Sequence, residues 1–266
     1  MVDFLISVAC YNNESEVIKF AQGLQKQTLA DRIKLVVTCN SCSNPDSFSD
    51  NLKKVFEKSE VYVPEKNLGY LNGCLNGFKN QVEPYRWGLI SNTDIEFSSE
   101  DFFEKIRSMQ NDDVWCIGPD IILVDSGIHQ NPYISQRPTK LKKMLRDYIF
   151  SHYLLYMIYL YMHYCKVKFV KRMVPNLQSG FVYAVHGSCF ILRRDCINAM
   201  LAENNEMFMY DEEFFIAEVV FKHKKQCFFN VDLKLLHNEH QTTGFVKEKI
   251  KQKWFKQSIN YLKKFY

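Results

Sequence analysis

Three polar residues, Asn92-Thr93-Asp94, follow a short apolar run at 87–90 that is typical of the end of a buried strand. A carboxylate at the carboxyl end of a strand in an α/β sheet points into the crevice where such sheets bind ligands. In that position Asp94 could share a hard divalent cation with the phosphates of a nucleotide. The alternative is that Asp94 only caps or turns the chain, as Asp commonly does after a strand.

A second acidic group, Asp211-Glu212-Glu213, precedes an apolar segment that we expect to form a helix over 214–221. A carboxylate placed beside a hydroxyl can act as its general base, which is worth about 10²–10⁴ in rate. Like charges close together also raise the pKa of at least one of them. The residues alone equally permit a structural role, because acidic residues stabilise the N-terminus of a helix.

His237 and His240 follow a strand expected over 227–236 and are three residues apart. On a helix they could share a metal ion. In a loop, His237 could instead reach a bound phosphate or complete a metal shell. A structural role is the alternative, since a single His is more often structural than a ligand.

Cys39-x-x-Cys42 has the spacing of redox-active and metal-binding cysteine pairs. No second pair and no nearby His complete a zinc site. A helix N-terminus lowers the pKa of a redox-active thiol, whereas Asn44-Pro45 follows this pair. We therefore expect two thiols in a ligand-lining loop, with redox chemistry as the alternative.

The elements that position these residues alternate between strands and helices. Short apolar runs at 4–9, 33–38 and 61–63 are typical of strands, and residues 17–24 have helical periodicity. This alternation indicates a parallel sheet with crossover helices. A hydrophobic content of 47%, 24% charged residues and a net charge of +4 indicate a globular protein and give no sign of nucleic-acid binding. Nine scattered cysteines and the lack of an N-terminal signal pattern predict a cytoplasmic protein.

Three glycines are spaced four residues apart in Asn67-x-Gly69-x-x-x-Gly73-x-x-x-Gly77. This spacing predicts a turn followed by a helix that packs closely through Gly73 and Gly77. The segment matches neither the dinucleotide-binding G-x-G-x-x-G pattern nor a phosphate-binding P-loop.

These segments, in this order, resemble glycosyltransferase family 2, and most closely its rhamnosyltransferase-like branch. The resemblance covers about 4–125 and 181–245. Its segments are 6–12, 36–44, 67–73, 92–94, 185–194, 208–214 and 236–242. It implies an α/β protein of GT-A (Rossmann-like) fold, with a mainly parallel central sheet flanked by helices. It also implies an inverting enzyme that uses a nucleotide-sugar donor.

By this resemblance, Asp94 binds Mg²⁺ or Mn²⁺ against the donor diphosphate and His237 completes the metal shell. Glu213 is the general base, with Glu212 as its acidic neighbour. The residues implied in donor binding are Tyr11, Asn12, Asn40, Asn67, Gly69, Asn92, His186 and Gly187. The sequence departs from the family at Cys39, where an Asp commonly binds the nucleotide base, and in Glu212-Glu213, where Glu-Asp is usual.

The resemblance divides the chain into a nucleotide-sugar-binding half (1–125), an insertion (126–180), an acceptor and catalytic half (181–245) and a C-terminal helix (246–266). The insertion contains an aromatic segment, 148–164, with basic residues on both sides. The C-terminal helix is basic and amphipathic. Both segments favour contact with a membrane surface; packing against the core or in a homodimer is the alternative.

The sequence therefore predicts a metal-dependent inverting glycosyltransferase at the inner face of the plasma membrane. Its acceptor would be a glycan or a polyprenyl-diphosphate-linked glycan, in surface polysaccharide or lipopolysaccharide assembly. Two alternatives remain: a catalytically silent scaffold that binds a nucleotide or glycan, and a nucleotidyltransferase.

Overall fold

The computed structural model describes residues 2–170, 177–238 and 246–266. The strands are β1 (Phe4–Tyr11), β2 (Ile33–Ser41), β3 (Ser59–Tyr62), β4 (Trp87–Ser91), β5 (Ile95–Phe97), β6 (Val114–Leu123), β7 (Gly180–Val182), β8 (Cys189–Arg193) and β9 (Gln226–His237). The helices are α1 (Glu14–Gln25), α2 (Pro45–Val55), α3 (Tyr70–Lys79), α4 (Phe102–Ser108), α5 (Lys140–Ser151), α6 (Tyr153–Val170), α7 (Arg194–Ala202), α8 (Glu212–Lys222) and α9 (Glu248–Leu262).

One sheet runs through the described part of the molecule in the order β3-β2-β1-β4-β8-β6-β9-β5, and β7 pairs with β9 beside this path. Strands β3, β2, β1 and β4 are parallel, as the alternation of strands and helices predicts. Beyond β4 the sheet is mixed, because β8 runs antiparallel to both β4 and β6. The α/β fold is confirmed, with a parallel N-terminal half and a mixed second half.

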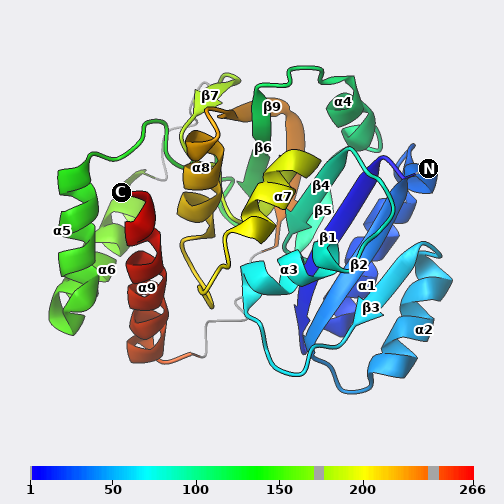
Figure 1. Cartoon of the computed structure of the whole chain (residues 1–266), viewed down its shortest axis with the longest axis horizontal. Helices are drawn as coiled ribbons and strands as arrows, with labels where there is room; N and C mark the ends of the chain where they lie inside the picture. The colour runs from blue at the N-terminus through cyan, green and yellow to red at the C-terminus, as the bar shows by residue number, and fades with distance from the viewer. Residues whose placement is uncertain (1, 171–176, 239–245) are drawn as a thin grey trace.

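Helices cover both faces of this sheet (Figure 1). Alternate residues of β1 belong to two apolar clusters, with Phe4 and Ile6 on one face and Leu5 on the other. Helix α1 buries its predicted stripe, Val17, Phe20, Ala21 and Leu24, against the first face. This two-sided core fixes the register of the sheet, because a slip by one residue would move each side chain of β1 to the opposite cluster and disrupt the packing of both faces.

Helix α3 packs closely on the sheet, as the glycine spacing predicts. A Cβ atom at Gly77 would lie 2.2 Å from Ser7 Oγ, and one at Gly73 would lie 3.1 Å from the Cβ of Ala9. The helix therefore approaches β1 at a distance that larger side chains would prevent. This approach holds the loop before α3 against the ends of β1 and β2.

The aromatic segment 148–164 forms parts of two helices and not a single one. Helix α5 ends at Ser151 and α6 begins at Tyr153, with His152 in an extended conformation between them. His152 Nδ1 lies 2.8 Å from the carbonyl oxygen of Tyr148, so the imidazole satisfies a backbone group at the end of α5. In the described ranges no helix has the length and hydropathy needed to cross a bilayer.

The C-terminal helix α9 packs as an ordinary amphipathic helix. Ser258, Ile259 and Leu262 are buried, whereas Lys253 and Lys256 face outward. This arrangement matches the alternative in which a lysine-rich solvated face covers a core-packed stripe. Helices α5, α6 and α9 form a group at one end of the molecule (Figure 1), around a small core of Phe150, Tyr156 and Ile259.

A buried ionic network attaches this group to α8. Glu218 is 1% exposed and accepts hydrogen bonds from Arg137, Lys143 and Tyr183. Lys143 is itself buried, so its ammonium group depends on this carboxylate for charge compensation. A buried charge that loses its partner is strongly unfavourable.

Replacing Glu218 with Gln is expected to lower the free energy of unfolding by about 3–5 kcal/mol, because it leaves two cations without a counter-charge. Urea denaturation at constant pH measures this difference. Asp112→Asn is a matched control, since its carboxylate pairs with Arg193 while 90% exposed, and we expect a loss below about 1 kcal/mol. Equal losses in the two variants would contradict a buried ionic attachment.

Candidate functional site

A cavity of about 600 Å³ opens at the carboxyl ends of β1, β2 and β4. This volume is ordinary for a site that binds a small molecule. Of the residues that the sequence analysis assigned to catalysis, metal and donor binding, those that line it are Tyr11, Asn40, Asn67, Gly69, Asn92, Asp94, His186, Gly187, Glu212, Glu213 and His237. Asn12 lies outside the lining, where its side chain accepts a hydrogen bond from Ser41 Oγ; the adjacent Asn13 lines the cavity.

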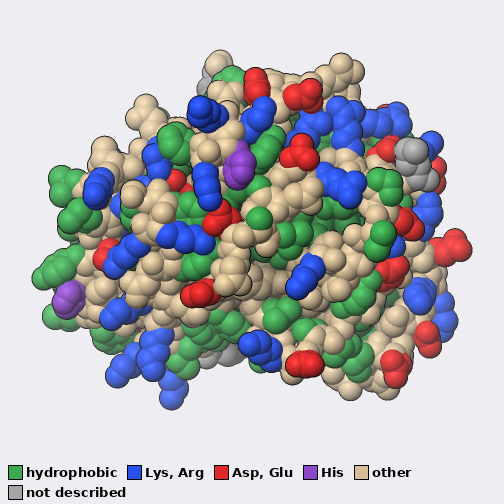
Figure 2. Space-filling model, viewed as in Figure 1, with side chains coloured by type: hydrophobic (Ala, Val, Ile, Leu, Met, Phe, Trp, Pro, Cys, Tyr) green, Lys and Arg blue, Asp and Glu red, His purple; other side chains and the backbone are tan. Residues whose placement is uncertain are grey.

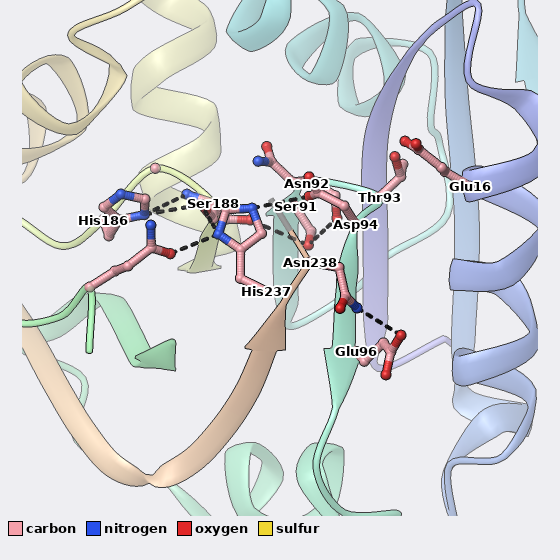
Figure 3. A network of polar contacts seen from close by, with 12 residues as sticks. Glu16, Ser91, Asn92, Thr93, Asp94, Glu96, His186, Ser188, His237 and Asn238 are labelled. Atoms are coloured by element: carbon pink, nitrogen blue, oxygen red, sulfur yellow. Dashed lines mark hydrogen bonds and ion pairs between the residues drawn. The ribbon is translucent and has the colours of Figure 1, made fainter. Parts of the chain in front are cut away.

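Asp94 and His237 are brought together by the pairing of β5 with β9. Ile95 lies opposite His237 in that antiparallel pair, so Asp94, one residue earlier, reaches the same point. The amide of Asn238 donates to the carbonyl oxygen of Asp94 at 2.9 Å and fixes this corner. Asp94 Oδ1 lies 3.2 Å from His237 Nε2 (Figure 3).

Gln130 orients the imidazole of His237. Its Oε1 lies 2.7 Å from His237 Nδ1, and an amide oxygen can only accept, so Nδ1 carries the proton and Nε2 is left as a ligand atom. Metal-binding histidines are commonly held in this way by an acceptor on the other ring nitrogen. The role of Gln130 could not be predicted, because nothing in the local sequence links residue 130 to residue 237.

The pair fits the donor atoms of a divalent cation. Two ligand atoms that each lie about 2.1 Å from an octahedral ion are about 3 Å apart, which matches the distance between Asp94 and His237. A carboxylate oxygen with an imidazole nitrogen suits Mn²⁺, and Mg²⁺ also accepts the carboxylate. The remaining ligands of such an ion would come from a bound substrate and water. His240 lies outside the described residues.

Two residues with positive φ, Tyr210 (70°) and Asp211 (68°), precede the acidic first turn of α8. Non-glycine residues seldom adopt this conformation, and where they do the strain is often part of a functional site. The turn brings both glutamates to the cavity. Glu212 Oε1 accepts from the amide of Tyr210 at 2.9 Å, and Glu213 Oε1 accepts from the amide of Gly187 at 3.1 Å.

Gly187 provides the space that Glu213 occupies. A Cβ atom at position 187 would lie 2.6 Å from Glu213 Oε1. Gly187, predicted to bind the donor, lines the cavity, and the close approach of its backbone is to the Glu213 carboxylate. The segment that leads into β8 therefore sets the position of Glu213.

The environment of the two glutamates favours their protonated forms. Burial raises the pKa of both carboxyl groups well above the ordinary value, and repulsion from Glu213 raises the pKa of Glu212 further. The negative charge of Asp211 acts in the same direction on Glu213, and Arg146 opposes it. Arg146 comes from α5 and is paired with Asp211. A carboxylate with a raised pKa is a stronger base than an exposed one.

Amide side chains shape the end of the cavity formed by β2 and the loop at 67–70. Asn40 donates to the carbonyl oxygen of Gly69 at 2.9 Å and accepts from the amide of Leu68 at 3.0 Å. Gly69 has φ of 79°, and a Cβ atom there would lie 1.8 Å from the carbonyl oxygen of Phe208. Asn40 therefore holds the loop at 67–70, and Asn67 supports the same loop by accepting from the Gly69 amide.

Burial lowers the pKa of His186 to about 4, so its imidazole is neutral at neutral pH. The Ser188 amide donates to His186 Nδ1 at 3.2 Å, which places the ring proton on Nε2. The aromatic ring of Tyr133 lies edge-on to this imidazole, at 5.7 Å between centroids. His186 can thus donate a hydrogen bond beside the cavity without carrying a charge.

Helix α9 contributes an aromatic wall that the sequence analysis did not assign to the site. Trp254 lines the cavity, and the neighbouring Phe255 stacks on Tyr210 with ring centroids 4.1 Å apart. The C-terminal helix therefore supports the turn that precedes Glu212 and Glu213. The amphipathic pattern of α9 indicated a buried stripe but gave no sign of which surface it covers.

The structure joins Cys39 and Cys42 by a disulfide, so the expectation of two thiols is wrong. Helix α2 begins at Pro45 with Asn44 as its N-cap, and proline is readily accepted at the first position of a helix. The cysteine pair therefore does precede a helix N-terminus. Cys10, at the end of β1, places its Sγ 3.8 Å from that of Cys42.

No protein-family model matches the sequence, and no curated protein is similar to it in sequence. Solved glycosyltransferases have a similar fold. One is the mannosyltransferase PcManGT from Pyrobaculum calidifontis in complex with GDP-Man and Mn²⁺ (TM-score 0.58, 10% identity, 96% of this chain and 62% of that one). Another is GalNAc-T7 with UDP, GalNAc and Mn²⁺ (TM-score 0.63, 11% identity, 98% and 48%). A third is residues 1–349 of S. aureus TarS with UDP-GlcNAc (TM-score 0.57, 12% identity, 90% and 59%).

The chain spans less than two thirds of the length of each of these three proteins. At 10–12% identity the likeness concerns the fold. The chain has the GT-A glycosyltransferase fold, as the sequence motifs predict. Its rhamnosyltransferase-like branch stays a prediction.

Proposed function

We propose that the protein is a metal-dependent inverting glycosyltransferase. The observation that carries this proposal is the convergence of the Asp94–His237 pair and Glu213 on one cavity of a GT-A fold. The three similar structures were solved with nucleotides or nucleotide sugars, two of them also with Mn²⁺. The donor would be a nucleoside-diphosphate sugar, and the sugar moved a hexose or deoxyhexose.

In this mechanism Asp94 and His237 would hold Mg²⁺ or Mn²⁺, and the ion would supply Lewis-acid stabilisation of the negative charge on the leaving nucleoside diphosphate. Glu213 removes the proton from an acceptor hydroxyl while its oxygen attacks the anomeric carbon. The new C–O bond forms on the face opposite the bond that breaks, so the configuration inverts. The Gly187 amide holds Glu213 in place for this transfer.

The acceptor is a glycan or a polyprenyl-diphosphate-linked glycan, in the assembly of a surface polysaccharide or lipopolysaccharide at the inner face of the plasma membrane. The aromatic side chains of Tyr210 and Trp254 support an acceptor of this kind, because they line the cavity beside Glu213. Trp254 belongs to α9, which also packs against α5 and α6. The acceptor side of the cavity thus lies next to the aromatic insertion.

A thermal-shift screen of nucleoside diphosphates and nucleotide sugars, with and without Mn²⁺, tests this function. A ligand that binds the native state alone raises Tm by an amount that grows with its saturation; at 100 times Kd it adds about 2.7 kcal/mol of stability. We expect a Mn²⁺-dependent shift with one class of nucleoside diphosphate, followed by release of that diphosphate during turnover. Binding without turnover would favour a silent scaffold. Release of pyrophosphate would favour a nucleotidyltransferase.

A further inference from the structure

Helix α5 turns two of its four cations inward and several of its large apolar side chains outward. Lys143 and Arg146 are paired with the buried carboxylates of Glu218 and Asp211. The exposed apolar side chains of the same helix are Leu141, Met144, Leu145 and Tyr148. A helix that borders water carries its charges on the outside. The outer side of α5 is therefore suited to an apolar neighbour.

Over Tyr153–Met162, helix α6 is apolar around its whole circumference. Among its described side chains only Tyr156 is buried, where it packs on Phe150. The exposed ones include Tyr153, Leu154, Met157, Ile158, Tyr159, Tyr161, Met162 and Tyr164. Leu154 is 72% exposed and Tyr161 is 70% exposed. A helix that is apolar on every side is normally covered, and large exposed apolar patches mark interaction sites.

We call the exposed apolar residues of α5 and α6 the α5–α6 surface. Figure 2 shows hydrophobic side chains that project at this end of the molecule, on the left of the view, beside lysine and arginine side chains. The surface contains several tyrosines, whose rings suit the boundary between lipid and water. Residues 140–172 carry eight Lys and Arg against one Asp. Lys171 and Arg172 lie outside the described residues, as do the side chains of Lys166 and Lys168; the exposed cations of α5 are Lys140 and Lys142.

The positive charge of this region favours an anionic bilayer over a second copy of the chain as the partner of the α5–α6 surface. A symmetric contact between two α5–α6 surfaces would bring two sets of cations together, which is unfavourable. Anionic lipid headgroups instead complement the cations, while the apolar side chains enter the boundary region of the bilayer. No helix in the described ranges is able to span the bilayer, so the contact lies along its surface.

We propose that the α5–α6 surface docks on an anionic bilayer and thereby presents the cavity to an acceptor carried on a lipid. The lipid-borne acceptor rests on the proposed function; the docking itself does not. Arg146 lies on the docked helix and pairs with Asp211, directly before Glu212 and Glu213. Trp254 of the adjoining α9 lines the cavity. The same helical group thus forms the membrane contact and supports the catalytic turn.

Co-sedimentation with vesicles of phosphatidylcholine, with and without phosphatidylglycerol, tests the docking on the full chain without any nucleotide. We expect binding to the anionic vesicles. The triple variant Leu145→Glu/Leu154→Glu/Ile158→Glu should reduce that binding at least about tenfold, because it places charges where apolar side chains enter the lipid. The double variant Val63→Glu/Val82→Glu alters two exposed valines in the 1–125 half of the chain and should bind as the wild type does.

Failure of the wild type to bind anionic vesicles would overturn the proposal. So would equal binding by the triple variant, since the vesicle contact would then not involve the α5–α6 surface. A dimer in sedimentation velocity that the triple variant dissociates would assign the surface to a second copy instead. Thermal shifts with nucleotides, measured on the same proteins, test the proposed function separately. Failure of the membrane docking therefore does not imply failure of the proposed function, and the reverse also holds.

Discussion

Glu213→Gln is expected to lower kcat for sugar transfer by about 10²–10⁴ while the KM for the donor stays close to that of the wild type. Glutamine keeps the size of the side chain and can still accept from the Gly187 amide, which donates to Glu213 at 3.1 Å. It cannot take a proton from the acceptor hydroxyl. The loss should therefore appear in the chemical step, measured as released nucleoside diphosphate under saturating donor and acceptor.

Glu212→Gln is the matched comparison, because it makes the same chemical change one residue away. Glu212 is buried and accepts from the Tyr210 amide, which glutamine can also do. We expect a smaller loss of kcat than in Glu213→Gln. A larger loss in Glu212→Gln would assign the base to Glu212, and full activity in both variants would remove the general-base mechanism.

The raised pKa of Glu213 has consequences for pH dependence. The base must be ionised, so kcat should increase as pH rises from about 5 to about 8, a range in which an ordinary carboxylate is already ionised. Glu213→Gln should abolish this increase. Flat activity above about pH 6 in the wild type would contradict a base with a raised pKa.

Because its pKa is raised, Glu213 lowers the free energy of unfolding at high pH, where it is ionised in the folded protein. A carboxyl group with a raised pKa in the folded state holds its proton more tightly there than in the unfolded chain. Its favourable contribution to the free energy of unfolding is therefore present at low pH and is lost as pH rises through the folded pKa. Glu213→Gln should therefore be more stable than the wild type at about pH 8, by about 1–2 kcal/mol, and nearly equal to it at about pH 5. Urea denaturation at the two pH values measures the difference.

The sequence was sufficient to locate the residues that follow a regular element directly. Asp94 and Glu213 lie at a strand end and a helix start, and both positions are visible as a change from apolar to acidic residues. The buried stripe of α1 and the close packing of α3 also follow from local spacing, since helix periodicity and glycine size act between near neighbours.

Long-range pairings account for what the sequence could not predict. Gln130 meets His237 only because β9 lies beside β6 in the sheet, and Arg146 meets Asp211 only because α5 packs against the start of α8. The disulfide between Cys39 and Cys42 differs from the prediction for a local reason, because Asn44-Pro45 after the pair does not by itself show that a helix begins there. The structure shows that Asn44 is the N-cap of that helix.

Asp94→Ala should abolish the Mn²⁺-dependent part of nucleoside-diphosphate binding. The variant removes the carboxylate that lies 3.2 Å from His237 Nε2, which leaves a single protein ligand for the ion. Divalent cations in phosphate-transfer sites are held by one or two protein carboxylates together with the substrate phosphates, so the loss of the carboxylate should also be severe for turnover. Mn²⁺ titration monitored by electron paramagnetic resonance, in the presence of the nucleoside diphosphate, measures the bound ion directly.

Two further variants separate a metal site from a merely structural ion pair. Gln130→Leu leaves both ligands in place but removes the acceptor that orients His237, and we expect Mn²⁺ affinity to fall by about 10–100-fold. Glu96→Ala removes a carboxylate two residues from Asp94 that is exposed and accepts from Asn238, so Mn²⁺ affinity should be unchanged (Figure 3). If Asp94→Ala still bound Mn²⁺ as the wild type does, the Asp94–His237 contact would be an ion pair that holds β5 to β9. The ligand set proposed for the metal would then be wrong, because no other observation places the ion at this corner of the cavity.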